Sequence, residues 1–188
     1  MCNFISFKIL PTIESNDHEV RILIDGNDLL GDDYLGLDPP AFFMQKNLFK
    51  TGELMIGRCT CGCEGCSDYP ITVYIDVDFI NWTDNNGLNL QFEKADYEKS
   101  ITEAKNNYSW EDVNRRVERF VTELLKNTQT KESYTFDWAS ARIKEDAITL
   151  SYSKNGDQKL FELPWDSEVI ETGITNAKYF LESKLKRQ

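Results

Sequence analysis

The stretch Ala147-Ile-Thr-Leu-Ser-Tyr-Ser-Lys-Asn-Gly-Asp-Gln-Lys-Leu-Phe-Glu-Leu163 carries a strong local folding signal. Two β-rich runs, Ala147–Ser153 and Gln158–Leu163, flank the dipeptide Asn155-Gly156. Asn-Gly favours a two-residue hairpin turn, because both central residues of that turn adopt a positive φ. The pattern therefore predicts an antiparallel hairpin in the last third of the chain.

Further β-rich runs lie upstream of this hairpin. In one of them, Val20, Ile22 and Ile24 alternate with Arg21 and Leu23, which is typical of a half-buried strand. The upstream strands are expected at Phe4–Leu10, Glu19–Ile24, Glu53–Thr60, Ile71–Asp76, Phe79–Thr83, Leu88–Phe92 and Tyr134–Ile143.

The segment Ser109–Asn127 has the clearest helical pattern in the chain. Ser109 can cap this helix, Asp112 occupies the capping-box position, and apolar residues recur every three or four positions. The stripe places Phe120 in the core, where its replacement by alanine would cost about 3–5 kcal/mol. Its members are Val113, Val117, Phe120, Val121, Leu124 and Leu125. Further helices are expected at Glu93–Asn106 and Ile174–Leu185, with a short one after Asp38.

The order strands, helices, strands, helix predicts an α+β fold, with antiparallel sheets and amphipathic helices packed on one side. A chain of 188 residues has the size of one ample domain. We therefore expect a single α+β domain over residues 1–188. The polar, non-periodic stretch Asn127–Ser133 is the place where a subdivision is expected, if there is one.

Charge limits the classes of partner. The chain has 32 acidic and 21 basic side chains, and its net charge is −11. Such a surface repels phosphate backbones and anionic membranes, which argues against nucleic-acid and membrane partners. It favours electrostatic steering toward a basic protein. The first residues lack the pattern of a signal peptide, and no run approaches the roughly 18 apolar residues of a membrane span, so a cytoplasmic location is expected.

Four of the five cysteines fall within eight residues, in Cys59-Thr-Cys61-Gly-Cys63-Glu-Gly-Cys66. Thiolates are soft ligands for zinc, cuprous copper and iron–sulfur clusters, and Cys63 and Cys66 have the spacing of half a structural zinc site. A second C-x-x-C unit is missing, however. Three interpretations stay open: small buried residues in a tight strand–turn–strand, a metal site, or a redox pair at Cys63 and Cys66.

The same cysteines bear on cofactors and on strand pairing. We predict no bound cofactor, with zinc held by Cys59, Cys61, Cys63 and Cys66 as the alternative. The β-rich runs on either side of the cysteine-rich segment are bounded by a glycine-containing turn. They are therefore expected to pair as antiparallel strands, with the segment as their connection.

The cysteine loop and its flanks resemble a group of uncharacterised bacterial proteins. The most specific part is the C-x-C-G-x-x-G-C loop Cys59–Cys66, followed by a strand that ends in Trp82-Thr-Asp84. Ile24–Leu30 upstream and Leu90–Tyr97 downstream extend the resemblance, which leaves out the last third of the chain. It implies a bacterial, cytoplasmic origin. It carries over no catalytic residue, because no activity is attached to the group.

Three catalytic or binding patterns were weighed and set aside. His18 is the only histidine, and it is expected in an exposed loop, so a Ser-His or Cys-His pair has little support. The acidic loop that starts at Asp25 fails the EF-hand pattern, because Leu29 and Leu30 occupy its fifth and sixth positions. Acids beside aromatics, as in Trp82-Thr-Asp84 and Phe136-Asp137-Trp138, could suit a sugar site, but aromatic packing is the simpler interpretation.

We therefore assign no catalytic and no cofactor-binding residues. The sequence favours a non-catalytic protein that binds and inhibits a basic protein partner, in the manner of an immunity protein or antitoxin. The alternative is a metal- or thiol-dependent protein that uses the Cys59–Cys66 loop.

Overall fold

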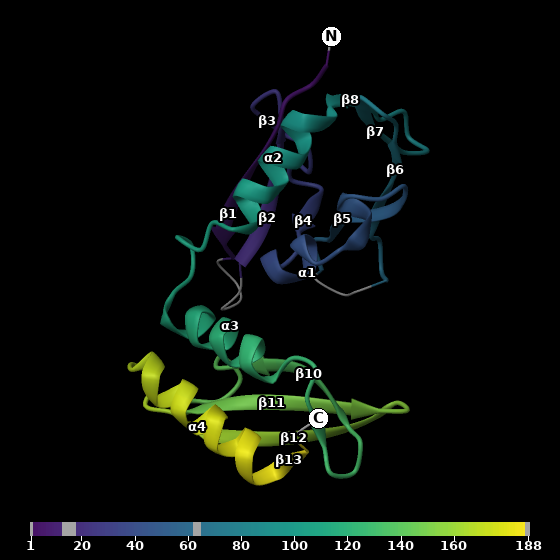
Figure 1. Cartoon of the computed structure of the whole chain (residues 1–188). Helices are drawn as coiled ribbons and strands as arrows, with labels where there is room; N and C mark the ends of the chain where they lie inside the picture. Colours follow the sequence, from purple (N-terminus) through teal and green to yellow (C-terminus); the bar gives the residue numbers. More distant parts are fainter. Residues whose placement is uncertain (1, 13–17, 62–64, 187–188) are drawn as a thin grey trace. The chain divides into compact units, whose positions relative to one another are not determined.

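The structure is a computed structural model that describes residues 2–12, 18–61 and 65–186 (Figure 1). The chain divides into two compact units, Met1–Trp110 and Glu111–Gln188, called unit 1 and unit 2 below. The stretch where a subdivision was expected, Asn127–Ser133, lies inside unit 2. It contains strand β9 (Gln129–Thr130), whose Thr130 is buried, and these two residues are too few to show a periodic pattern.

The first sheet of unit 1 has the order β1-β2-β3. Strands β1 (Ile5–Pro11) and β2 (His18–Ile24) pair antiparallel, as the alternating pattern predicts, and β3 is Asn27–Asp28. Asp25 and Gly26 both adopt a positive φ, which gives the tight turn between β2 and β3.

The second sheet of unit 1 has five antiparallel strands in the order β4-β5-β6-β7-β8. The predicted pairing of the runs on either side of the cysteine loop is confirmed, because β5 and β6 are antiparallel neighbours. The strands of this sheet are β4 (Tyr34–Gly36), β5 (Gly52–Cys59), β6 (Tyr69–Ile75), β7 (Phe79–Thr83) and β8 (Asn89–Glu93).

Two α-helices and a short 3-10 helix complete unit 1. Helix α1 (Pro39–Phe43) begins after Asp38 as predicted, and η1 (Lys46–Leu48) follows it. Helix α2 (Lys94–Lys105) contributes the buried Tyr97 and Ile101 to the core. The edge-to-face rings of Trp82 and Phe92, with centroids 5.4 Å apart, lie against Tyr97 in this core.

Unit 2 has one antiparallel sheet, in the order β12-β11-β10-β9-β13, and two helices (Figure 1). Asn155 and Gly156 adopt φ values of 52° and 84°, so the predicted hairpin turn is confirmed. The remaining elements are α3 (Val113–Leu125), β10 (Thr135–Ser140), β11 (Ala147–Lys154), β12 (Asp157–Pro164), α4 (Ile170–Lys184) and β13 (Leu185–Lys186).

Both helices of unit 2 cover the same face of the sheet. Ile148, Leu150 and Tyr152 alternate along β11, so they share one face, and they belong to the same core as buried side chains of α3 and α4. The α+β class with antiparallel sheets is therefore confirmed. Among the described residues, no helix is both long and apolar enough to cross a membrane.

Helix α3 differs from the prediction at its start and on one face. Its N-cap is Asp112 instead of Ser109, and the Asp112 side chain accepts a hydrogen bond from the Arg115 backbone N–H at 2.8 Å. Phe120 is 39% exposed, so its predicted place in the core was wrong. The buried face carries Val117, Glu118 and Val121 instead, because a buried ion-pair network takes one position of the apolar stripe.

Candidate metal centre

Three of the four clustered cysteines come together at one end of the β5–β6 hairpin. Cys59 is the last residue of β5, while Cys61 and Cys66 lie in the connection before β6. The Sγ atoms of these three residues all lie within 4.8 Å of one another. The fourth predicted ligand, Cys63, lies outside the described residues. Cys2 lies elsewhere in unit 1, with its Sγ 4.0 Å from Oε1 of Gln91.

The spacing of the three sulfurs suits a metal ion better than simple packing. In a tetrahedral zinc site with Zn–S bonds of about 2.3 Å, neighbouring sulfurs lie about 3.8 Å apart. The observed cluster therefore needs only small side-chain movements to close around an ion. Cys61 and Cys66 are exposed and Cys59 is half-buried, so the interpretation as small buried packing residues is wrong for the described cysteines.

The three thiols interact with one another directly. Hydrogen bonding to Cys61 and then to Cys59, together with the repulsion between their charges, raises the pKa of the Cys66 thiol to about 11. Thiols packed this closely cannot all ionise without a cation among them, because like charges at short range disfavour the charged form. A divalent cation reverses this effect, since it deprotonates the thiols that coordinate it.

The strands that carry the cluster form a firm base. Tyr34 in β4 lies directly opposite Cys59, and Tyr69 in β6 lies opposite Gly57. The Tyr34 and Tyr69 ring centroids are 4.7 Å apart. A Cβ at Gly57 would lie 3.2 Å from Cβ of Tyr34 and 3.0 Å from Cδ2 of Leu30, so the glycine leaves room for this packing.

Hydrogen bonds fix both sides of the cysteine connection. The Gly65 backbone N–H donates to Oδ2 of Asp68 at 3.0 Å, and Gly65 has a φ of +75° that favours glycine. The Tyr69 hydroxyl donates to Oδ2 of Asp84 at 3.0 Å. Burial, followed by this bond to Asp84, raises the pKa of Tyr69 to about 12. The tyrosine therefore stays a neutral hydrogen-bond donor near neutral pH.

The acids considered for a sugar site have structural roles. Asp84 accepts hydrogen bonds from the backbone N–H groups of Asn86 and Leu88 at 2.7 and 2.8 Å, which hold the β7–β8 turn. Burial opposes ionisation of Asp84, but these bonds and the one from Tyr69 outweigh it and lower its pKa. Trp82 is fully buried in the core of unit 1. The two residues therefore do not form a shared open surface.

Two other sequence candidates are also accounted for by contacts within the fold. His18 is half-buried at the start of β2, with its ring centroid 5.0 Å from that of Trp110, so its expected exposure was wrong. In the acidic loop, Asp28 accepts from Nε of the buried Arg21 at 2.8 Å. Asp25 accepts from the Phe4 backbone N–H and from Asn3. These carboxylates bind parts of the chain itself, which agrees with the rejection of a calcium loop.

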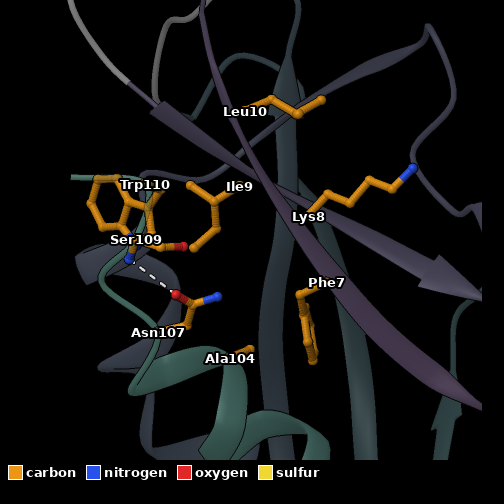
Figure 2. A pocket seen from close by; sticks show the side chains of 8 residues that line it. All are labelled: Phe7, Lys8, Ile9, Leu10, Ala104, Asn107, Ser109 and Trp110. Atoms are coloured by element: carbon orange, nitrogen blue, oxygen red, sulfur yellow. Dashed lines mark hydrogen bonds between the residues drawn. The ribbon is translucent and has the colours of Figure 1, made fainter. Parts of the chain in front are cut away.

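A shallow pocket of about 270 Å³ lies beside β1 and the end of α2 (Figure 2). Oδ1 of Asn107 accepts from the Ser109 backbone N–H at 3.0 Å, so this amide already serves the turn after α2. The only basic side chain of the lining, that of Lys8, points away from Trp110 (Figure 2). The lining residues are Phe7, Lys8, Ile9, Leu10, Ala104, Asn107, Ser109 and Trp110. They bring together no group of acids, bases or nucleophiles.

Sequence reasoning missed a buried charge cluster in unit 2. Glu118 accepts hydrogen bonds from the Ser140 hydroxyl, the Ala141 backbone N–H and Nε of Arg142, at 3.1, 2.7 and 2.9 Å. Arg115, which is also buried, lies 3.6 Å from the same carboxylate. The available signal was an acid three residues after an arginine on the core side of α3. The cluster joins α3 to the end of β10.

Comparison with known proteins adds no family to these observations. The chain matches no family model, no curated protein and no solved structure. Its resemblance to the group of bacterial proteins with the C-x-C-G-x-x-G-C loop therefore stays a prediction. The chemistry of the cysteine cluster rests on the positions of its own three described thiols.

Proposed function

We propose that unit 1 is a zinc-binding unit in which Cys59, Cys61 and Cys66 hold the ion as thiolates. The observation that carries the proposal is the approach of their three Sγ atoms to within 4.8 Å of one another. The choice of zinc follows from the ligands, because soft thiolates select zinc, cuprous copper or iron–sulfur clusters, and zinc sites use three or four separate cysteines.

The proposed role of the zinc is to hold the loop, not to catalyse a reaction. The ligands tie the end of β5 to the connection that leads into β6, so the ion closes the open end of this hairpin. Binding energy at such a site adds to folding energy, because the ligand positions do not persist in the unfolded chain. The fourth coordination position falls either to Cys63, the ligand predicted from the sequence, or to water.

Metal analysis of the purified full-length protein tests this function. We expect one zinc per chain, and we expect the double variant Cys61→Ser/Cys66→Ser to lose it. The matched control is Cys2→Ser, because Cys2 lies outside the cluster, and it should keep its zinc. A Cys63→Ser variant that loses zinc identifies the fourth ligand, and one that keeps it identifies water. Equal, background zinc in the wild type and the double variant would overturn the proposal.

A second candidate function, binding to a basic protein, is favoured by the distribution of charge. Unit 1 contains 18 acidic and 8 basic side chains, whereas unit 2 contains 14 and 13. Nearly all of the net negative charge therefore belongs to unit 1. We propose that an immunity- or antitoxin-like inhibitory role would use unit 1, because a strongly acidic unit attracts a basic partner from a distance.

Calorimetry against the purified product of an adjacent gene tests this second function. Steering by unit 1 predicts tight binding that weakens as salt increases, since salt screens exposed charges. Replacing the exposed pair Asp32 and Asp33 in unit 1 by asparagine should slow association. The control replaces the exposed pair Glu145 and Asp146 in unit 2 in the same way. Binding that is equally salt-sensitive and equally fast in both variants would contradict a role for unit 1.

A further inference from the structure

We propose that the cluster is also an oxidation site, at which hydrogen peroxide joins Cys61 and Cys66 in a disulfide and thereby releases the zinc. This inference rests on the proposed zinc function. It concerns the regulation of the same site and names the oxidant, the residue pair and the product.

Accessibility selects these two sulfurs. Cys61 and Cys66 are exposed, whereas Cys59 is half-buried at the end of β5. Oxidation by peroxide follows thiolate character and exposure. Zinc coordination supplies the thiolate character, because the coordinating sulfurs are deprotonated. The two exposed ligands are therefore the ones that peroxide reaches first.

Distance and chain separation allow this pair to form a bond. The two Sγ atoms already lie within 4.8 Å of each other, and a disulfide brings them to about 2.05 Å. Both residues lie in the connection between strands, not in a strand, so their approach does not require the paired backbone of β5 and β6 to move. Cys59 and Cys61 are separated by one residue only, which leaves little freedom for the geometry of a disulfide.

The reaction balances with peroxide as the only oxidant. The thiolate of one exposed cysteine attacks a peroxide oxygen, the O–O bond breaks, and the leaving hydroxide takes a proton to become water. The resulting sulfenic acid is attacked by the second thiolate, the S–O bond breaks, and a second water forms. The two sulfurs together lose two electrons, and peroxide gains two. The zinc keeps its charge and leaves, because two of its ligands are now joined to each other.

The body of the hairpin is independent of these sulfurs. The Tyr34–Tyr69 ring contact and the hydrogen bond from Tyr69 to Asp84 involve no cysteine. Oxidation is therefore expected to change the connection between β5 and β6 while the sheet of unit 1 persists. Reduction with dithiothreitol in the presence of zinc should restore the starting state.

The experiment treats the zinc-loaded full chain with hydrogen peroxide. Zinc release is followed with a chromogenic chelator, and the disulfide is located by peptide mass spectrometry without reduction. We expect zinc release and the appearance of a Cys61–Cys66 linked peptide to share one time course. Dithiothreitol should reverse both. The Cys2→Ser variant should behave like the wild type.

The outcomes separate the two proposals. A purified chain without zinc overturns the zinc function itself. A chain that contains zinc and keeps it under peroxide overturns only the oxidation site. Zinc release with sulfinic acid and no disulfide, or with a disulfide that involves Cys59, also overturns the assignment of the pair. Far-UV circular dichroism of the oxidised chain adds a readout of the sheet, whose loss would contradict a change confined to the connection.

Discussion

Single carboxylates hold several turns of this protein, although its sequence shows them only as an excess of acid. Asp166 is an example at the residue scale. Its side chain accepts hydrogen bonds from the backbone N–H groups of Val169 and Glu168, at 2.8 and 3.1 Å, and from the Thr172 hydroxyl at 3.1 Å. The bonds from Val169 and then Glu168 lower the pKa of Asp166. Such a carboxylate stabilises the folded state only while it is ionised.

Replacing Asp166 by alanine should therefore destabilise the protein in a pH-dependent way. The pKa is lower in the folded state than in the unfolded state, so the stabilisation is present above the unfolded value of about 3.9 and is lost as the pH falls through the folded value. Urea unfolding at about pH 7 should show a lower midpoint for the variant, and the gap should narrow toward about pH 3. The control is Glu168→Ala at the exposed neighbouring position. A gap that does not change with pH would contradict this role.

At the scale of elements, α3 shows where a periodic pattern succeeds and where it fails. Val117, Val121 and Leu125 are fully buried, as the stripe predicts. Phe120 instead lies at the edge, with the Arg119 guanidinium carbon 4.5 Å from its ring centroid. An apolar residue next to a stripe has the same sequence signature as one inside it, so only the packing separates them.

Alanine variants of α3 measure this difference. Leu125→Ala removes a fully buried side chain and should lower the free energy of unfolding by about 2–5 kcal/mol. Phe120→Ala removes a 39% exposed ring and its contact with Arg119, and should cost about 1 kcal/mol. Urea unfolding monitored by fluorescence gives both values. A Phe120 effect as large as that of Leu125 would show that the ring is buried in solution.

The accuracy of prediction from sequence follows the length and regularity of the elements. The runs at Phe79–Thr83 and Ala147–Ser153 give strands β7 and β11 almost residue for residue, because five or more alternating residues fix the period. Strands β3, β9 and β13 have two residues each and pair only in the context of the sheet.

The candidate site was predictable in part, for a related reason. Clustered cysteines are visible in any sequence, so Cys59, Cys61 and Cys66 could be identified as candidate ligands. Their mutual distance depends on the β5–β6 pairing. Their base depends on Tyr34 and Tyr69, which come from opposite sides of β5. Neither feature has a local sequence pattern, so the metal and packing interpretations could not be separated until the fold was known.

At the scale of the whole molecule, each unit has its own hydrophobic core. The core of unit 1 is built around residues such as Trp82, Phe92 and Tyr97, whereas that of unit 2 includes Tyr152 and Phe180. The sheet of unit 2 also contains its last strand, β13, which pairs with β9. All of the strands and helices that form the core of unit 2 therefore come from the same continuous part of the chain.

We accordingly expect a fragment of residues 111–188 to fold without unit 1. Its sheet and both of its helices are complete, and a core that contains Val117, Val121 and Leu125 from α3 closes against Ala177 of α4. The fragment should show a cooperative urea transition and a near-UV circular dichroism signal from packed aromatic rings. As a control, Leu125→Ala should lower the urea midpoint of the fragment as it does in the full chain. A fragment without a near-UV signal, which unfolds gradually, would show that unit 2 depends on unit 1 for its packing.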